Sequence, residues 1–219
     1  MDSRFSTRRL TIEDAPEIRK LLLLYFDEEV TSKCLQLSAT EKEAFMDTYV
    51  EFVVPQGVSV GVFDLKSNEM CGCVFATEWN KFLHPGSYET GKHTPSLNKT
   101  IEFDEFMLED MPRIVNNRTY LHLEVIIVNP KFQRQGLGVH LMQSFEDIAL
   151  EKKFEMVVGV ANTNKSVQLM KKMGFHLHNY VLYSEYKDPA TGEAIFQNIP
   201  PPDTGAVFCY KVMSSKRGG

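Results

Sequence analysis

The stretch Val125-Ile-Ile-Val-Asn-Pro-Lys-Phe-Gln-Arg-Gln-Gly-Leu-Gly-Val-His-Leu141 decides the fold. Its four β-branched residues, Val125 to Val128, predict a strand, and Asn129-Pro130 predicts the turn that ends the strand. Apolar residues recur at helical spacing after the paired glycines Gly136 and Gly138, so a helix begins at or just before Gly136. The stretch therefore predicts a strand, a glycine-containing loop and a helix in direct succession.

The loop between this strand and helix has the chemistry of an anion site. The first N–H groups of a helix have no internal partner and carry the positive end of the helix dipole, so they attract phosphate. A Rossmann motif would need Gly or Ala at Leu141, and the P-loop-like segment 86–93 has His93 where Ser or Thr would contact magnesium. The sequence therefore predicts a pyrophosphate site of another kind.

Two motifs show a resemblance to a known family. Gln133-Arg134-Gln135-Gly136-Leu137-Gly138 resembles the acetyl-coenzyme A loop (Q/R-x-x-G-x-G/A) of the GNAT superfamily of N-acetyltransferases, and Lys171 to Phe175 resembles the helix end of that family. The resemblance implies acetyl-CoA as cofactor, held along the strand at Ile126, Ile127 and Val128. The loop residues that it implies in cofactor binding are Gln133, Arg134, Gln135, Gly136, Leu137, Gly138 and Val139.

Composition narrows the class of protein further. A net charge of −5 and a pI of about 5.7 argue against nucleic acid as the main partner. The four cysteines form no C-x-x-C pair, and Cys71 and Cys73 should share a strand face. The histidines show no metal-binding spacing beyond His176-x-His178 on a predicted strand. No apolar run is long enough to span a membrane and no secretory segment precedes the fold. We therefore expect a cytoplasmic, monomeric protein without metal.

The order of predicted elements defines the fold class. Strands are predicted near residues 5–12, 57–65, 70–77, 119–128, 154–160, 176–186 and 205–212. Helices are predicted from Asp14, over 40–54, around 101–111, after Gly136 and from 163 to 173, and 78–97 reads as a long loop. This order indicates an α/β (α+β) domain over residues 1–219, with a flexible tail at 214–219. As the family implies, a mixed sheet of about seven strands should carry helices on both faces.

The whole chain looks most like the insect and nematode type of arylalkylamine N-acetyltransferase. In those enzymes an acidic general base follows the first helix, and the matching residue here is Glu29, with Val30 in place of the usual proline. Because the acidic run Asp27-Glu28-Glu29 ends a helix against its dipole, it is either solvated surface or charge kept for a purpose. The resemblance favours the second interpretation.

Other candidate catalytic residues lie on the central strand and on the helix after it. His122 and Glu124 share one strand face, and His122 is either a satisfied core histidine or the base found on this strand in other GNAT branches. The tyrosine acid of the family falls on Met170. Insect-type enzymes use serines instead, which match Ser166 and Asn162; Ser166 could equally be a helix-surface residue, and we expect Asn162 beside the cofactor.

Two classes of function remain open from the sequence. Tyr25, Phe26, Phe45 and Tyr49 would form a flat apolar pocket, which suits the ring of an arylalkylamine acceptor. The acidic run keeps a polyamine acceptor open, and a protein N-terminus is a further competitor. The alternative class is an acyl-CoA-binding module that has lost catalysis, as Met170 and Asn162 suggest.

Overall fold

The computed structural model describes residues 4–78 and 94–214. The P-loop-like segment 86–93 and residues 215–219 of the expected tail lie outside the described residues. The strands are β1 (Phe5–Arg9), β2 (Val60–Asp64), β3 (Met70–Thr77), β4 (Tyr120–Val128), β5 (Met156–Ala161), β6 (His176–Leu182) and β7 (Gly205–Val212). The helices are η1 (Ile12–Asp14), α1 (Ala15–Glu28), α2 (Val30–Leu35), α3 (Ala39–Thr48), η2 (Tyr49–Val53), η3 (Val54–Gln56), α4 (Pro95–Met107), α5 (Met111–Val115), η5 (Pro130–Phe132), α6 (Leu137–Glu151) and α7 (Asn164–Lys172).

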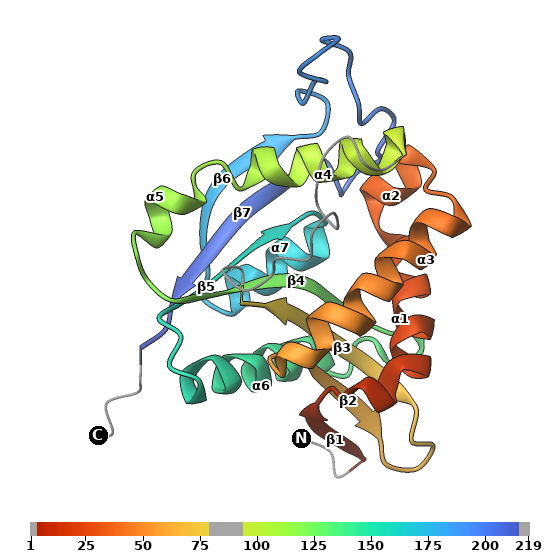
Figure 1. Cartoon of the computed structure of the whole chain (residues 1–219), viewed down its shortest axis with the longest axis vertical. Coiled ribbons are helices and arrows are strands. Elements are labelled where there is room, and N and C mark those ends of the chain that lie inside the picture. The colour runs from red at the N-terminus through yellow and green to blue at the C-terminus, as the bar shows by residue number, and fades with distance from the viewer. Residues whose placement is uncertain (1–3, 79–93, 215–219) are drawn as a thin grey trace.

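The strands that the structure describes form one seven-stranded sheet in the order β1-β2-β3-β4-β5-β7-β6. Among these described strands only β4 and β5 pair in parallel, and α6 makes the connection between them. All other neighbouring strands pair antiparallel. The mixed α/β sheet with helices on both faces that the sequence predicted is therefore confirmed (Figure 1).

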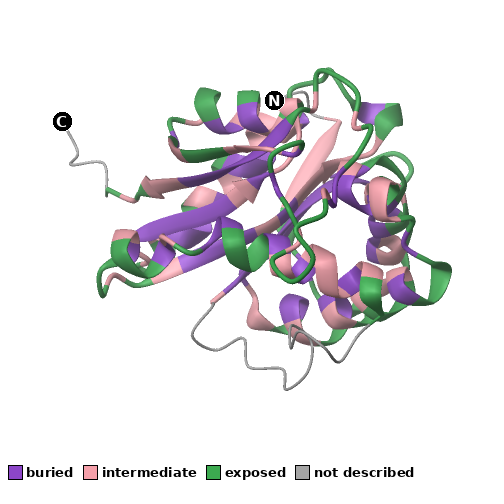
Figure 2. Ribbon diagram, turned by 90° about the horizontal axis from the view of Figure 1, so that it is seen from above, coloured by how far each residue is buried: buried purple, intermediate pink, exposed green. Residues whose placement is uncertain are grey.

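Three apolar clusters attach the helices to the sheet. On one face α6 and α7 pack over the central strands through residues such as Leu141, Phe145 and Met170. On the other face α1 and α3 cover β2 to β4, while α4 and α5 cover the β5–β7 half. Figure 2 shows the buried strand segments running between these helix layers. The second face therefore carries two separate helix groups, and β4 and β5 lie where the groups meet.

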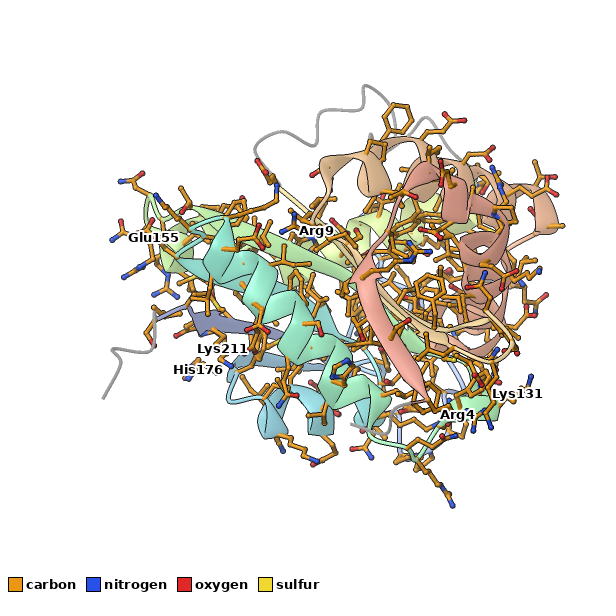
Figure 3. The ribbon with its side chains drawn as sticks, turned by 90° about the horizontal axis from the view of Figure 1, so that it is seen from below. Arg4, Arg9, Lys131, Glu155, His176 and Lys211 are labelled. Carbon is orange, nitrogen blue, oxygen red and sulfur yellow. The ribbon has the colours of Figure 1, made fainter. Side chains whose placement is uncertain are left out.

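One lysine shows how the α6–α7 layer is fixed to the sheet. Lys211 on β7 donates hydrogen bonds of 2.7 Å both to Glu146 on α6 and to the carbonyl oxygen of Met173 after α7. Figure 3 shows Lys211 beside α6 at the end of the molecule opposite Arg4 and Lys131. The position of α6 is thus set by polar contacts as well as by its apolar stripe.

β4 and β5 separate part of the way along their length. Their pairing ends at Leu123 opposite Gly159, whereas β4 stays paired with β3 as far as Val128. A Cβ atom at Gly159 would lie 2.9 Å from the carbonyl oxygen of Leu123, so only glycine allows the two strands to approach there. Beyond this point the β5-facing edge of β4, from Val125 to Val128, has no strand neighbour among the described residues.

The structure corrects three expectations about local elements. Asp14 does not start α1 as a capping box with Glu17; its carboxylate accepts hydrogen bonds from Arg8 and from the backbone of Thr11. The loop predicted to reach residue 97 is shorter, because the Thr94 side chain caps α4 and Pro95 begins it. Cys71 and Cys73 face opposite clusters, because a bulge in the β2–β3 pairing interrupts the alternation. Within the described ranges, no helix combines the length and the apolar character that crossing a membrane requires.

Candidate active site

The N-terminus of α6 has the form that the sequence predicted. Gly136 is the N-cap residue with φ +77°, a left-handed conformation that favours glycine, and Leu137 is the first helical residue. No described side chain caps this helix. Gln133, Arg134, Gln135 and Gly136 are exposed, so the free amides of the first turn face an accessible loop. Phosphate oxygens fit this arrangement.

The loop and the open strand edge adjoin each other. Ile126, Ile127 and Val128 are only half-buried, and the Gln133 amide donates a hydrogen bond of 3.2 Å to the carbonyl oxygen of Val128. A long ligand could therefore run from the α6 N-terminus along unpaired β4 backbone. Gly138 and Val139, in the first turn of α6, are also half-buried. The residues present fit a coenzyme A with its pyrophosphate on α6 and its arm on β4.

A cavity of about 260 Å³ opens where the two helix groups meet over β4 and β5. It is lined on one side by Tyr25, Phe26, Phe45 and Tyr49, and on the other by Thr100, Ile101, Asp104, Glu105 and Leu108 of α4. The sheet contributes His122, Leu123, Glu124, Val160 and Asn162, and the α1–α2 junction contributes Glu29, Thr31 and Ser32. The structure thus brings together all four aromatic candidates and all three candidate bases.

Glu29 has a role in the chain that the sequence did not reveal. It ends α1 and is also the N-cap of α2, so its charge faces a helix N-terminus as well as a C-terminus. Its Oε1 accepts hydrogen bonds from Thr31 N (3.0 Å) and Asn162 Nδ2 (2.8 Å), and its Oε2 accepts from Thr31 Oγ1 (2.7 Å) and Ser32 N (2.6 Å). The residue is 4% exposed. This is a fixed, buried carboxylate rather than solvated surface.

His122 and Glu124 form a buried pair on the cavity floor. His122 Nδ1 lies 2.8 Å from Glu124 Oε1, and the Thr77 hydroxyl donates to the same oxygen at 2.6 Å. Burial acts to lower the pKa of His122, but the charge and hydrogen bond of Glu124 outweigh it, so the pKa lies above its ordinary value. Glu124 is the extra residue of a bulge in the β3–β4 pairing, and its contact with His122 shows that the two side chains lie on the same face, as predicted.

Asp104 is, with Glu105, one of two acidic residues in the cavity that the sequence analysis missed. Part of its surface is accessible from the cavity. Desolvation by the surrounding protein raises the pKa of Asp104 to about 7, and the negative charge of Glu29 adds to the shift. The charged or titratable groups that act on it come from α1 (Tyr25), the α1–α2 junction (Glu29), β4 (His122, Glu124), α4 itself (Glu105) and the segment after β6 (Tyr183, Tyr186). No described cation forms an ion pair with it.

A helical spacing could have identified Asp104. Thr100, Ile101, Asp104, Glu105 and Leu108 recur at intervals of three and four residues, which places them on one face of α4. That face is half polar, unlike the apolar face around Phe103 and Met107 that packs on the sheet. The sequence shows two helix faces, but only the fold shows which one faces a cavity.

The remaining candidates divide between the cavity and other positions. Asn162 contacts Glu29, and its backbone carbonyl accepts a hydrogen bond of 2.6 Å from the Tyr183 hydroxyl. Ser166 does not line the cavity; its hydroxyl exchanges hydrogen bonds with Thr163 in the capping box of α7. Met170, on α7, is 2% exposed and packs in the apolar core that α6 and α7 form with the sheet. Among the described residues, no group of three or more potential metal ligands gathers.

Comparison with known proteins assigns the family. Residues 17–175 match the acetyltransferase (GNAT) family, so the chain belongs to this family, whose cofactor is acetyl-CoA. A search of curated protein sequences gave no match. The family and cofactor that the sequence motifs implied are thereby confirmed.

Several solved structures share the fold along nearly the whole chain. Arylalkylamine N-acetyltransferase 2 from Aedes aegypti superposes with a TM-score of 0.81 at 16% identity, covering 97% of this chain and 100% of that chain. The polyamine N-acetyltransferase of Drosophila melanogaster, which forms N-acetylagmatine, gives 0.77 at 17% identity, covering 95% and 99%. The C-terminal condensation domain of Ebony, in complex with β-alanyl-dopamine, gives 0.80 at 17% identity, covering 95% and 98%. At these identities the similarity shows the fold alone.

Proposed function

We propose that this protein is an acetyl-CoA-dependent N-acetyltransferase that acetylates a small primary amine, of the arylalkylamine type. The observation that carries the proposal is the cavity of about 260 Å³, which combines a wall of four aromatic rings with the buried carboxylate of Glu29 beside the open edge of β4. An aromatic ring fits the first feature and an ethylammonium fits the second.

Different residues of the chain would bind the cofactor and accept the proton in such a reaction. Bound acetyl-CoA would supply the acetyl thioester. The N-terminus of α6 would hold its pyrophosphate, and the edge from Ile126 to Val128 would orient its arm. An amine is protonated near neutral pH, so a base must take a proton before nitrogen can attack. We assign that base to Glu29, with the His122–Glu124 pair as the alternative on β4.

The structural neighbours support a small amine acceptor without selecting one. One is an arylalkylamine enzyme and another a polyamine enzyme, and both superpose over nearly the full chain. One observation favours the polyamine type as a second candidate. Asp104, Glu105 and Glu124 line the cavity in addition to Glu29, and several carboxylates suit an acceptor with several positive charges.

A panel of amines tests the proposal. Purified protein is given acetyl-CoA and one amine at a time, and thiol release is measured together with mass spectrometry of the product. We expect higher kcat/KM values for tyramine, dopamine, octopamine, serotonin and tryptamine than for spermidine and agmatine. Much higher kcat/KM values for the polyamines would replace the arylalkylamine assignment by the second candidate. If the protein binds acetyl-CoA but acetylates no amine, it is a binding module and the proposed activity is wrong.

A further inference from the structure

Glu29 cannot take a proton directly from an acceptor in the arrangement that the structure shows. A carboxylate offers about four lone-pair positions. All four are used, because each oxygen of Glu29 already accepts two hydrogen bonds. Glu29 lines the cavity, so direct transfer is prevented because an ammonium would first have to displace one of these four donors. A base in this state needs a neighbour that can pass a proton to it.

Only one of the four donors to Glu29 has the chemistry for that task. Two are backbone N–H groups, of Thr31 and Ser32, and one is the side-chain amide of Asn162. Amide nitrogens donate but do not accept. The fourth donor is the hydroxyl of Thr31, 2.7 Å from Oε2, and a hydroxyl keeps two acceptor lone pairs while it donates. Thr31 also lines the cavity in which the acceptor would lie.

We propose that Thr31 is a catalytic residue that relays the proton from the acceptor ammonium to Glu29. This inference rests on the proposed N-acetyltransferase activity and on Glu29 as its base. It explains how a carboxylate fully occupied by hydrogen bonds can still accept a proton from the cavity. Among the groups that bond Glu29, the Thr31 hydroxyl is the one that can accept a proton from the substrate while it donates one to the carboxylate.

The transfer balances in protons and electron pairs. An N–H bond of the ammonium breaks, and its proton forms a new O–H bond at Thr31 Oγ1. The original Oγ1–H bond breaks at the same time, and that proton bonds to Glu29 Oε2, so the hydroxyl is regenerated. The freed electron pair of nitrogen forms the N–C bond to the acetyl group as the C–S bond breaks. The second nitrogen proton leaves with the thiol, and Glu29 later returns its proton to solvent through the same hydroxyl.

Three variants separate this role from a structural one. Thr31→Val keeps the shape of the side chain and removes the hydroxyl, so we expect kcat/KM for 2-phenylethylamine to fall by about one to two decades. Thr31→Ser restores a hydroxyl and should stay within about threefold of the native protein. The matched control is Thr48→Val on α3, where the hydroxyl donates to the carbonyl oxygen of Ala44 in its own helix and the rate should not change. Thermal unfolding of each variant reports the cost of losing a contact in the first turn of α2.

A sharper test varies the pKa of the acceptor ammonium and measures how the defect of Thr31→Val changes. In 2,2-difluoro-2-phenylethylamine the fluorines lower the ammonium pKa, so at about pH 8 this acceptor is largely neutral and needs no proton acceptor. We expect the defect of Thr31→Val to shrink to about threefold or less with the fluorinated amine. A merely structural defect would reduce both acceptors equally.

The outcomes distinguish the relay from the activity on which it rests. Native protein that acetylates neither amine counts against the proposed function. If the native protein acetylates both, and Thr31→Val is either fully active or equally impaired with the two acceptors, the relay is wrong while the activity stands. Loss of rate in Thr31→Ser equal to that in Thr31→Val would also overturn it.

Discussion

Asn162 donates a hydrogen bond of 2.8 Å from its side-chain amide to Oε1 of Glu29. The contact joins the end of β5 to the junction between α1 and α2, which are separated by more than half of the chain. Asn162 is held in turn by Tyr183, whose hydroxyl bonds its backbone carbonyl at 2.6 Å. Through this chain of contacts the α1–α2 junction, the end of β5 and the segment after β6 are joined at one carboxylate.

Asn162→Ala should therefore destabilise the protein. A hydrogen bond to a charged group contributes about 1.5–3 kcal/mol, and its loss leaves one buried oxygen of Glu29 with a single donor. Urea unfolding should show a lower free energy of unfolding with an unchanged m-value. Asn179→Ala, at an exposed position on β6, is the control and should change stability by less than about 0.5 kcal/mol. Equal stability of both variants would show that the contact is not maintained in solution.

Glu29→Gln should reduce kcat/KM by about two decades or more, because a general base contributes roughly that much. The acid limb of the pH profile should disappear, while acetyl-CoA affinity is retained. His122→Ala and Glu124→Gln should each lose less. The new amide must place an NH₂ group among donors, so assays belong well below the midpoint of thermal unfolding. A near-native rate in Glu29→Gln, with the pH dependence lost in His122→Ala, would move the base to β4.

Gly136→Val should abolish stabilisation by acetyl-CoA. Valine is strained at φ +77° and would displace the first N–H groups of α6 from the phosphate position. A ligand at a hundredfold excess over its Kd stabilises by about 2.7 kcal/mol, which a thermal shift detects readily. Gly192→Val carries the same strain at φ +73° in a turn far along the chain, and should keep the full cofactor shift. An intact shift in Gly136→Val would remove the loop from the binding site.

The sequence predicted the parts of the site that local rules determine. The strand ending at Val128 and the helix starting after Gly136 follow from β-branching, the glycine pair and helical spacing, all within one short stretch. His122 and Glu124 share a face because a strand alternates over two residues. Each of these inferences needed only neighbours in the chain.

What the sequence could not reveal depends on contacts between distant elements. Nothing near Glu29 indicates that Asn162 would bond it, or that α2 would begin at the next residue and turn an unfavourable charge into a cap. Bulges also break the alternation without a local signal, as Cys71 and Cys73 show. Asp104 acquires its shifted pKa only because other elements surround it.

Asp104→Asn should make the protein more stable at alkaline pH. The folded-state pKa of about 7 lies above the unfolded value, so folding disfavours the charged form. The native protein therefore loses stability as pH rises from about 4 to 7, and the variant does not carry this cost. Unfolding midpoints should differ at about pH 8 and converge below about pH 4. Because Asp104 is partly exposed, the difference should be small, and Glu109→Gln on exposed surface should show none of it.

The same carboxylate should set a pH-dependent preference between acceptors. Above neutral pH, Asp104 faces the cavity as an anion, and no described Lys, Arg or His forms a close ion pair with it. An acceptor with a second positive charge would supply that partner, whereas a monoamine would not. Two amines of matched shape isolate this effect, 4-trimethylammonio-phenethylamine and 4-tert-butyl-phenethylamine, because only the first carries a fixed second charge. An amine that is not acetylated can be scored by its inhibition constant against an active one.

In the native protein, the preference for the charged amine over its neutral analogue should rise by about fivefold between about pH 6 and pH 8, the range of a partly exposed ion pair. The rise follows the sign of the titration, since Asp104 gains its negative charge as pH passes about 7. Asp104→Asn should give a flat, lower ratio, and effects on folding or cofactor binding cancel because both amines share them. A ratio that still rises with pH in Asp104→Asn would assign the titration to another cavity group, His122 first among them.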